Sequence, residues 1–148
     1  HRHLHVRSRR QRQICIRDRS TGLPAELGEL VKIRASQING CAYCLHMHTS
    51  DALTMDIDPR KLMMVATWHE ATALFDERER AALRLTESLT RVADGGVPDE
   101  VFATAREYFD DHELGQLVAS IAMINTWNRI AIAGGYPAGL DERRSRDI

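Results

Sequence analysis

Apolar residues recur every three or four positions along most of the chain, the spacing that gives an α-helix one buried face. The first such run begins near Leu23, accepts Pro24 in its first turn and ends before the helix-breaking pair Asn39–Gly40. Its apolar positions are Leu27, Leu30, Val31 and Ile38. We therefore predict a helix over residues 23–38. Its polar residues Lys32 and Arg34 are expected to face solvent, as a helical glutamate such as Glu29 does by default.

Capping residues and glycines divide the rest of the chain into five more helices. The predicted ranges are 41–53, 59–70, 76–94, 98–109 and 114–133. Asp58 is a cap before Pro59, and the pairs Asp76/Glu79 and Asp110/Glu113 both have capping-box spacing. The core candidates are Leu62, Met63, Val65, Ala66, Ala82, Leu85, Leu89 and Val92. Short connections predict that neighbouring helices are antiparallel.

The last predicted helix, residues 114–133, is apolar nearly all the way round. Such a helix must be covered on every side, either as the central helix of the core or through contact with another copy of the chain. Asn125 and Asn128 lie inside this run and would be costly if buried without partners. We expect both to hydrogen-bond to the ends of neighbouring helices.

The composition supports a single all-α domain of about six helices. The chain has 148 residues, a length that fits one domain, and 43% of them are hydrophobic, which is enough for a core. Aromatic residues are few, at 5%, and stretches of alternating Val, Ile and Thr are missing, so helices are favoured over a sheet. No apolar run approaches the roughly 20 residues of a membrane span, so no membrane association is expected.

The net charge of −1 hides two segments of opposite charge. Residues 1–20 contain seven arginines and one aspartate, a charge of +6, whereas residues 21–148 carry −7. The basic segment lacks the interleaved aromatic residues of single-strand binders, so we expect no nucleic-acid partner. We expect residues 1–20 to be a disordered arm or an addition foreign to the natural protein, residues 21–140 to be the helical domain, and residues 141–148 to be a charged tail.

The candidate chemistry lies in the run from Cys41 to His48. Cys44 follows Cys41 by three residues and His48 follows Cys44 by four, so one face of a helix carries all three side chains. The cysteines fall in a first helical turn, where free amide groups and the helix dipole favour a thiolate. His48 can accept a proton from Cys44 or pair with its thiolate. Cys15 has no partner at a comparable spacing.

Two other interpretations of this run stay open. A structural zinc site would need four ligands, and the chain offers one Cys-X-X-Cys pair and His48 without a second pair downstream. Cysteines are also among the most buried residues, so the pair could be an inert part of the core. An odd number of cysteines, three in all, argues against a disulfide framework and favours a reducing cytoplasm.

The run from Glu29 to Ala52, ELVKIRASQINGCAYCLHMHTSDA, resembles the signature of the alkylhydroperoxidase D-like branch of the carboxymuconolactone decarboxylase family. The resemblance extends more loosely from about Leu23 to about Ala133. It includes the segments WHEA at Trp68, DERERAAL at Asp76 and NTWNR at Asn125. It implies an all-helical fold and a homo-oligomer, either a trimer or a hexamer.

The resemblance also implies a function and a role for each site residue. Cys44 would be the nucleophile that attacks a hydroperoxide, and Cys41 would resolve the resulting sulfenic acid to a disulfide. His48 would be the base, and Glu29 would relay protons through Cys41. Trp68 is expected to pack under this site. An external dithiol, a lipoyl group on a partner protein, would reduce the disulfide, and no metal or bound organic cofactor would be required.

The sequence thus predicts a thiol-dependent, antioxidant peroxidase. Two alternatives are a lactone decarboxylase, which the wider family includes and which does not rely on the cysteine pair, and a non-catalytic redox sensor. The complete Cys-X-X-Cys-X-X-X-His pattern argues against the decarboxylase. Catalytic rather than single-turnover consumption of peroxide would exclude the sensor.

Overall fold

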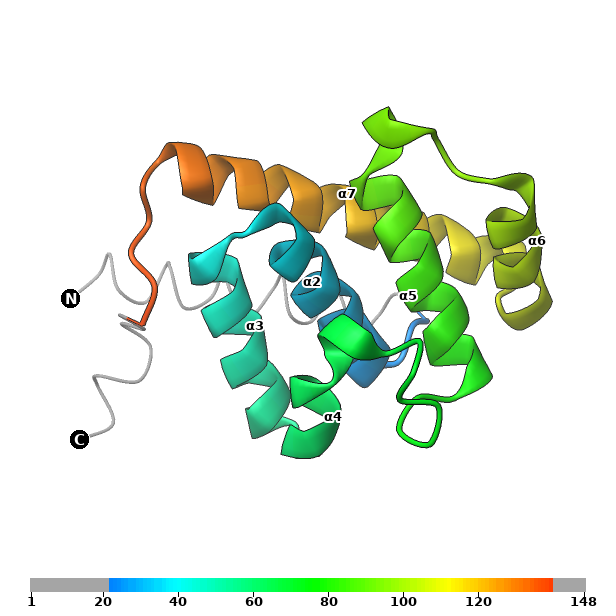
Figure 1. Ribbon diagram of the computed structural model, residues 1–148, viewed down its shortest axis with the longest axis horizontal. Helices are drawn as coiled ribbons and strands as arrows, with labels where there is room; N and C mark the ends of the chain where they lie inside the picture. The colour runs from blue at the N-terminus through cyan, green and yellow to red at the C-terminus, as the bar shows by residue number, and fades with distance from the viewer. Residues whose placement is uncertain (1–21, 140–148) are drawn as a thin grey trace.

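The computed structural model describes residues 22–139, and within them the chain is built from helices without strands. Figure 1 shows the arrangement. The α-helices are α2 (Ala25–Asn39), α3 (Ala42–Thr54), α4 (Pro59–Met63), α5 (Glu77–Thr90), α6 (Asp99–Tyr108) and α7 (Asp111–Ala133), and two 3₁₀ helices are η1 (Val65–Thr67) and η2 (Val92–Asp94). The predicted all-α class of about six helices is confirmed. The predicted arm, Cys15 and the predicted tail lie outside the described residues.

Helix α2 is the central element, because it packs against α3, α5 and α7. Figure 1 shows α2 between α3 and α5, with α7 running across them. Buried side chains of α2 therefore contribute to every part of the core, among them Leu30 and Val31 at 0% exposure. None of the helices in residues 22–139 is long and apolar enough to span a membrane.

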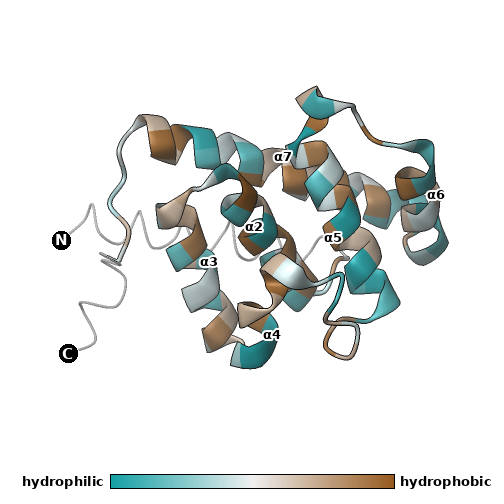
Figure 2. Ribbon diagram, viewed as in Figure 1, coloured by the Kyte–Doolittle hydropathy of each residue, from teal (hydrophilic) through white to brown (hydrophobic). Residues whose placement is uncertain are grey.

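Helix α7 covers one side of α2 rather than lying at the centre. Its inward residues are Leu114, Leu117, Ile121, Ile124, Asn128 and Ala131. Met123, Trp127 and Ile130 lie on its other side and are 58%, 47% and 42% exposed. Figure 2 shows that hydrophobic and hydrophilic residues alternate along the helices. Of the two alternatives for this helix, the central position is therefore wrong, and contact with another copy remains a proposal.

The helix boundaries follow from the predicted caps. Asp76 accepts the amide of Glu79 while the Glu79 carboxylate accepts the amide of Asp76, and Asp110 and Glu113 form the same reciprocal pair. Each cap satisfies amide groups that a helix start would otherwise leave unpaired, and a good N-cap stabilises a helix by roughly 1 kcal/mol. Both predicted capping boxes are confirmed.

The helix predicted over residues 59–70 is wrong beyond its first turn. Helix α4 ends at Met63 and gives way to η1. The buried residues here are Leu62, Val65 and Trp68, which are spaced by three, the period of a 3₁₀ helix and not of an α-helix. Met63 and Ala66, predicted to be core, are exposed. Val92 is also exposed, because α5 ends at Thr90 and η2 turns its side chain outward.

Two further predictions about buried polar residues have different outcomes. Asn39, the last residue of α2, donates to the side-chain oxygens of Asn125 and Asn128, at 2.9 Å each, so the predicted contacts with a helix end are confirmed. Arg34 is not on a solvated face, since its guanidinium pairs with Glu87 at 2.7 Å. The indole of Trp68 donates to the same carboxylate at 2.9 Å.

Candidate active site

The turn between α2 and α3 places both cysteines. Gly40 ends α2 in the left-handed conformation, with φ of 67°, which glycine adopts without strain. The Cys41 amide then donates to the Ser36 carbonyl at 3.0 Å. This bond holds the chain against the end of α2 while it enters α3, so the position of the dithiol depends on how α2 ends.

Cys41 is the N-cap of α3 and Cys44 lies in its first turn. The Cys44 amide donates to the Cys41 sulfur at 3.4 Å, which directs that sulfur toward the second cysteine. Both are free thiols and both are about 1% exposed. They pack with Ala35 of α2 and with Ile124 and Ala131 of α7, and Tyr43 partly covers this cluster. The thiols therefore lie in the seam between α3 and α7.

Burial controls the ionisation of Cys44. Loss of hydration raises the pKa of the Cys44 thiol to about 12, and its hydrogen bond with Cys41 acts in the same direction. A hydrogen bond from Asn128 opposes the shift without outweighing it. The expectation of a thiolate at neutral pH is therefore wrong for this closed conformation, because it considered the helix terminus and not the cover that α7 provides.

Glu29 and His48 form a hydrogen-bonded pair beside the dithiol. The Glu29 carboxylate lies 2.9 Å from His48 Nδ1 and 3.1 Å from the Lys32 ammonium. Burial alone would raise the pKa of Glu29, but the hydrogen bond to His48 and the charges of His48 and Lys32 together hold it below its ordinary value. Glu29 is 5% exposed. Lys32 is largely covered as well, so the solvated face predicted for Lys32 is wrong.

The imidazole therefore connects α3 to α2. Because His48 follows Cys44 by one helical turn, the pair with Glu29 is held next to the thiols. Among residues 22–139, the His48 ring hydrogen-bonds to Glu29 and not to either cysteine sulfur. The Glu29 carboxylate hydrogen-bonds to His48 and Lys32, and not to Cys41. Any proton relay from Glu29 thus runs through the histidine in this conformation. Trp68, expected under the site, instead packs in a separate cluster with Leu30, Ile33 and Leu83.

Sequence reasoning missed that two further residues lie at the candidate site. Asp51 brings a carboxylate oxygen within 4.8 Å of ligand atoms of Glu29 and His48, and its spacing of three residues from His48 could have indicated this. Among the described residues, Glu29, His48 and Asp51 are the group that could hold a metal ion, and this group does not include the cysteines. The positively charged Lys32 ammonium already lies beside Glu29 at this place. Asn128 was expected to have a structural role, and it also forms a hydrogen bond to Cys44 that lowers the pKa of that thiol.

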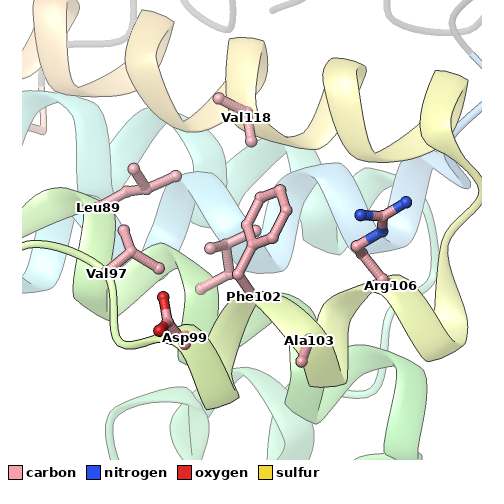
Figure 3. A pocket seen from close by; sticks show the side chains of 8 residues that line it. Leu89, Val97, Asp99, Phe102, Ala103, Arg106 and Val118 are labelled. Atoms are coloured by element: carbon pink, nitrogen blue, oxygen red, sulfur yellow. The ribbon is translucent and has the colours of Figure 1, made fainter.

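A cavity of about 500 Å³ lies elsewhere, between α5, α6 and α7. Figure 3 shows Phe102 inside it, with Asp99 and Arg106 toward opposite ends. None of the four predicted site residues lines this cavity. The candidate chemistry is therefore confined to the α2, α3 and α7 side of the molecule.

The chain is similar in sequence to known proteins. A model of the carboxymuconolactone decarboxylase family matches residues 12–88. The uncharacterized protein YdfG of Bacillus subtilis is 44% identical over 110 residues, which cover 74% of this chain and 74% of that protein. The matched residues include Glu29, Cys41, Cys44 and His48.

Solved structures resemble most of the fold. A protein of unknown function from Agrobacterium tumefaciens, described as a candidate antioxidant defence protein AhpD, has 35% identity and a TM-score of 0.79, over 83% of this chain and 84% of that one. An uncharacterized peroxidase-related protein from Silicibacter has 24% identity and a TM-score of 0.67, over 76% of this chain and 59% of that one, a likeness that shows the fold alone.

Proposed function

We propose that this chain, which belongs to the carboxymuconolactone decarboxylase family, is an alkylhydroperoxidase D-like peroxidase that reduces hydroperoxides with its own dithiol. The observation that carries the proposal is the placement of two free, adjacent thiols next to a buried Glu29–His48 pair. A dithiol with an acid–base pair at hand is what reversible two-electron reduction of a peroxide requires.

In the first step, Cys44 attacks as a thiolate. Its sulfur bonds to one oxygen of the hydroperoxide as the O–O bond breaks, giving a sulfenic acid on Cys44 and an alkoxide that takes up a proton and leaves as an alcohol. His48 accepts the thiol proton and returns it to the leaving oxygen, either directly or through a water molecule. Glu29 supports the protonated imidazole through the 2.9 Å contact with Nδ1.

In the second step, Cys41 resolves the oxidised cysteine. Its thiolate attacks the Cys44 sulfur, an S–S bond forms, and the sulfenic oxygen leaves as water after taking up a proton. The 3.4 Å contact between the Cys44 amide and the Cys41 sulfur supports this role, since it directs the sulfur toward its partner. An external dithiol, a lipoyl group on another protein, then exchanges with the disulfide and is itself oxidised. A reducing cytoplasm suits this cycle.

We also propose that the chain forms a homo-oligomer through α7. Met123, Trp127 and Ile130 follow one another at helical spacing and leave a stripe of large apolar side chains in solvent. A second copy carrying the same stripe would cover it. The resemblance implies a trimer or a hexamer.

A dihydrolipoamide-coupled assay of peroxide consumption tests the peroxidase proposal. Wild type should turn over many equivalents, whereas Cys44→Ser should be inactive and Cys41→Ser should stop after one equivalent. Peptide mapping after peroxide treatment should find a Cys41–Cys44 disulfide that spares Cys15. Absence of turnover in the wild type, with a clean disulfide after one equivalent, would replace the proposal with a redox sensor, which the burial of both thiols favours as the second candidate.

A further inference from the structure

The dithiol is closed off from solvent by residues on both sides of one seam. Cys41 caps α3 and Cys44 lies in its first turn, while Ile124 and Ala131 of α7 form the facing wall. Both cysteines are about 1% exposed. A hydroperoxide therefore cannot reach either sulfur unless part of this cover moves.

Two tyrosines meet at this seam. Tyr43 lies between the cysteines on α3 and packs on the thiol cluster. Tyr136 follows α7, and its ring stands edge-on to that of Tyr43, with 5.3 Å between centroids and 89° between planes. Unlike the cysteines, Tyr136 is 46% exposed. The pair thus joins the start of α3 to the end of α7, with the outer ring partly in solvent.

The backbone before Tyr136 leaves room for its ring. A Cβ atom added to Gly134 would lie 2.6 Å from Cε1 of that ring, so the ring occupies space that a side chain at Gly134 would fill. Gly135 has φ of +61°, a conformation that favours glycine. The Tyr136 amide is nevertheless anchored, since it donates to the Ala131 carbonyl at 3.0 Å. The backbone is held in place, and the side chain is the part that can swing.

We propose that Tyr136 is the residue that determines access to the dithiol: its ring closes the seam against Tyr43, and rotation away from Tyr43 admits the hydroperoxide. The proposal rests on the peroxidase function for the identity of the substrate. Hydrogen peroxide needs a small opening, whereas a bulky organic hydroperoxide needs the ring fully displaced. Tyr136 therefore sets which hydroperoxides react.

Opening would also change the chemistry of the thiol. Lost hydration is the first cause of the raised pKa of Cys44, so water that enters with the substrate returns the thiol toward its ordinary acidity. His48, one turn along α3, then has a thiol that it can deprotonate. The closed seam keeps the Cys44 thiol protonated until a substrate enters.

The test measures how fast iodoacetamide alkylates the reduced protein at fixed pH. Peptide mapping identifies which cysteines are alkylated. Tyr136→Ala should accelerate alkylation of Cys41 and Cys44 by about 2- to 10-fold, the range that loss of one aromatic pair allows. Gly134→Ala should do the same by displacing the ring. Gly115→Ala is the matched control in α7, because nothing lies within 4 Å of its added Cβ, and Tyr136→Phe should match the wild type because it keeps the ring.

The ratio of the rate with cumene hydroperoxide to the rate with hydrogen peroxide should rise in Tyr136→Ala. Wild-type alkylation rates in both Tyr136→Ala and Gly134→Ala, with unchanged circular dichroism, would overturn the proposal and leave the peroxidase function untouched. Faster alkylation in both variants together with no peroxide turnover in any protein would support the access role and refute the peroxidase.

Discussion

The Nδ1 atom of His48 lies 2.9 Å from the Glu29 carboxylate, so the base predicted for Cys44 is held by the acid predicted to act through Cys41. The two residues come from different helices, α3 and α2, and are both largely buried. This arrangement makes Glu29 an orienting partner of the imidazole. Their contributions to the reaction should therefore be linked rather than independent.

Replacing His48 by Ala should slow formation of the Cys44 sulfenic acid by roughly 10²- to 10⁴-fold, the usual contribution of general acid–base catalysis. Glu29→Gln should slow the same step, because it leaves the imidazole without its ionised partner. The double variant should be no slower than His48→Ala alone, since interacting residues are not additive. Stopped-flow peroxide reduction measures all three rates. If Glu29→Gln slowed only the formation of the disulfide, that result would instead support a proton relay from Glu29 through Cys41.

Stability should fall with acid in a way that depends on Glu29. Its pKa is lowered in the folded protein, so its contribution to stability is present above its ordinary pKa of about 4.3 and is lost as pH falls through the folded value. Urea denaturation should thus show wild type more stable than Glu29→Gln at pH 7, with the gap closing below about pH 4. Glu77→Gln, at an exposed position, is the control and should show a smaller gap at pH 7.

Alkali should destabilise the protein through Cys44. The unfolded thiol ionises near pH 8.5, whereas the folded one has a pKa of about 12, so stability is full below about pH 8.5 and is lost as pH rises toward 12. Cys44→Ala removes this contribution, and its stability should decline less between pH 8 and pH 11 in denaturation under reducing conditions. Identical declines in both proteins would mean that Cys44 is hydrated.

Asn128→Ala should destabilise the fold by about 1–3 kcal/mol, the cost of leaving buried partners without their hydrogen bonds. The Asn128 amide donates to Ser36 Oγ at 3.0 Å and its oxygen accepts from Asn39. Asn128→Ala should also raise the pKa of Cys44 further, because the Asn128 hydrogen bond opposes the effect of burial on that thiol. Ultraviolet absorbance of the thiolate would measure this change. Thr126→Ala, on the exposed side of α7, is the control and should be near neutral in both measurements.

Trp127→Glu should shift the protein toward monomers by placing a charge in the proposed contact stripe of α7. Light scattering at micromolar concentrations would measure this. Val92→Glu replaces an apolar residue of similar exposure on η2 and should leave the assembly unchanged. A monomeric wild type, or equal dissociation by both variants, would count against the stripe as the contact.

Local signals in the sequence predicted the helix boundaries well, because caps and glycines act within a few residues. Asp76 with Glu79 and the Asn39–Gly40 turn are examples. The α-helix predicted around Val65 was wrong, because the three-residue spacing of its buried residues is that of a 3₁₀ helix and was taken for the longer period of an α-helix. The difference between these cases lies in how many residues the signal spans.

The site was predictable only in part, because its environment comes from distant segments. The spacing of the cysteines and His48 placed them on one helix, as found. The burial of Glu29 depends on counter-charges from His48 and Lys32, and the ionisation of Cys44 depends on its burial against α7. Tyr136 meets Tyr43 across 93 positions of sequence, and no pattern in the chain indicated that contact.

The left-handed turn at Gly40 also fixes the rotational setting of α3. Each residue of an α-helix advances the side-chain direction by about 100°. Inserting a single residue between Gly40 and Cys41 would therefore turn the sulfurs away from Ile124 and Ala131 and toward water, while leaving the Cys-X-X-Cys spacing intact. Homologues or designs that keep the spacing but change the length of this turn should carry thiols of a different reactivity.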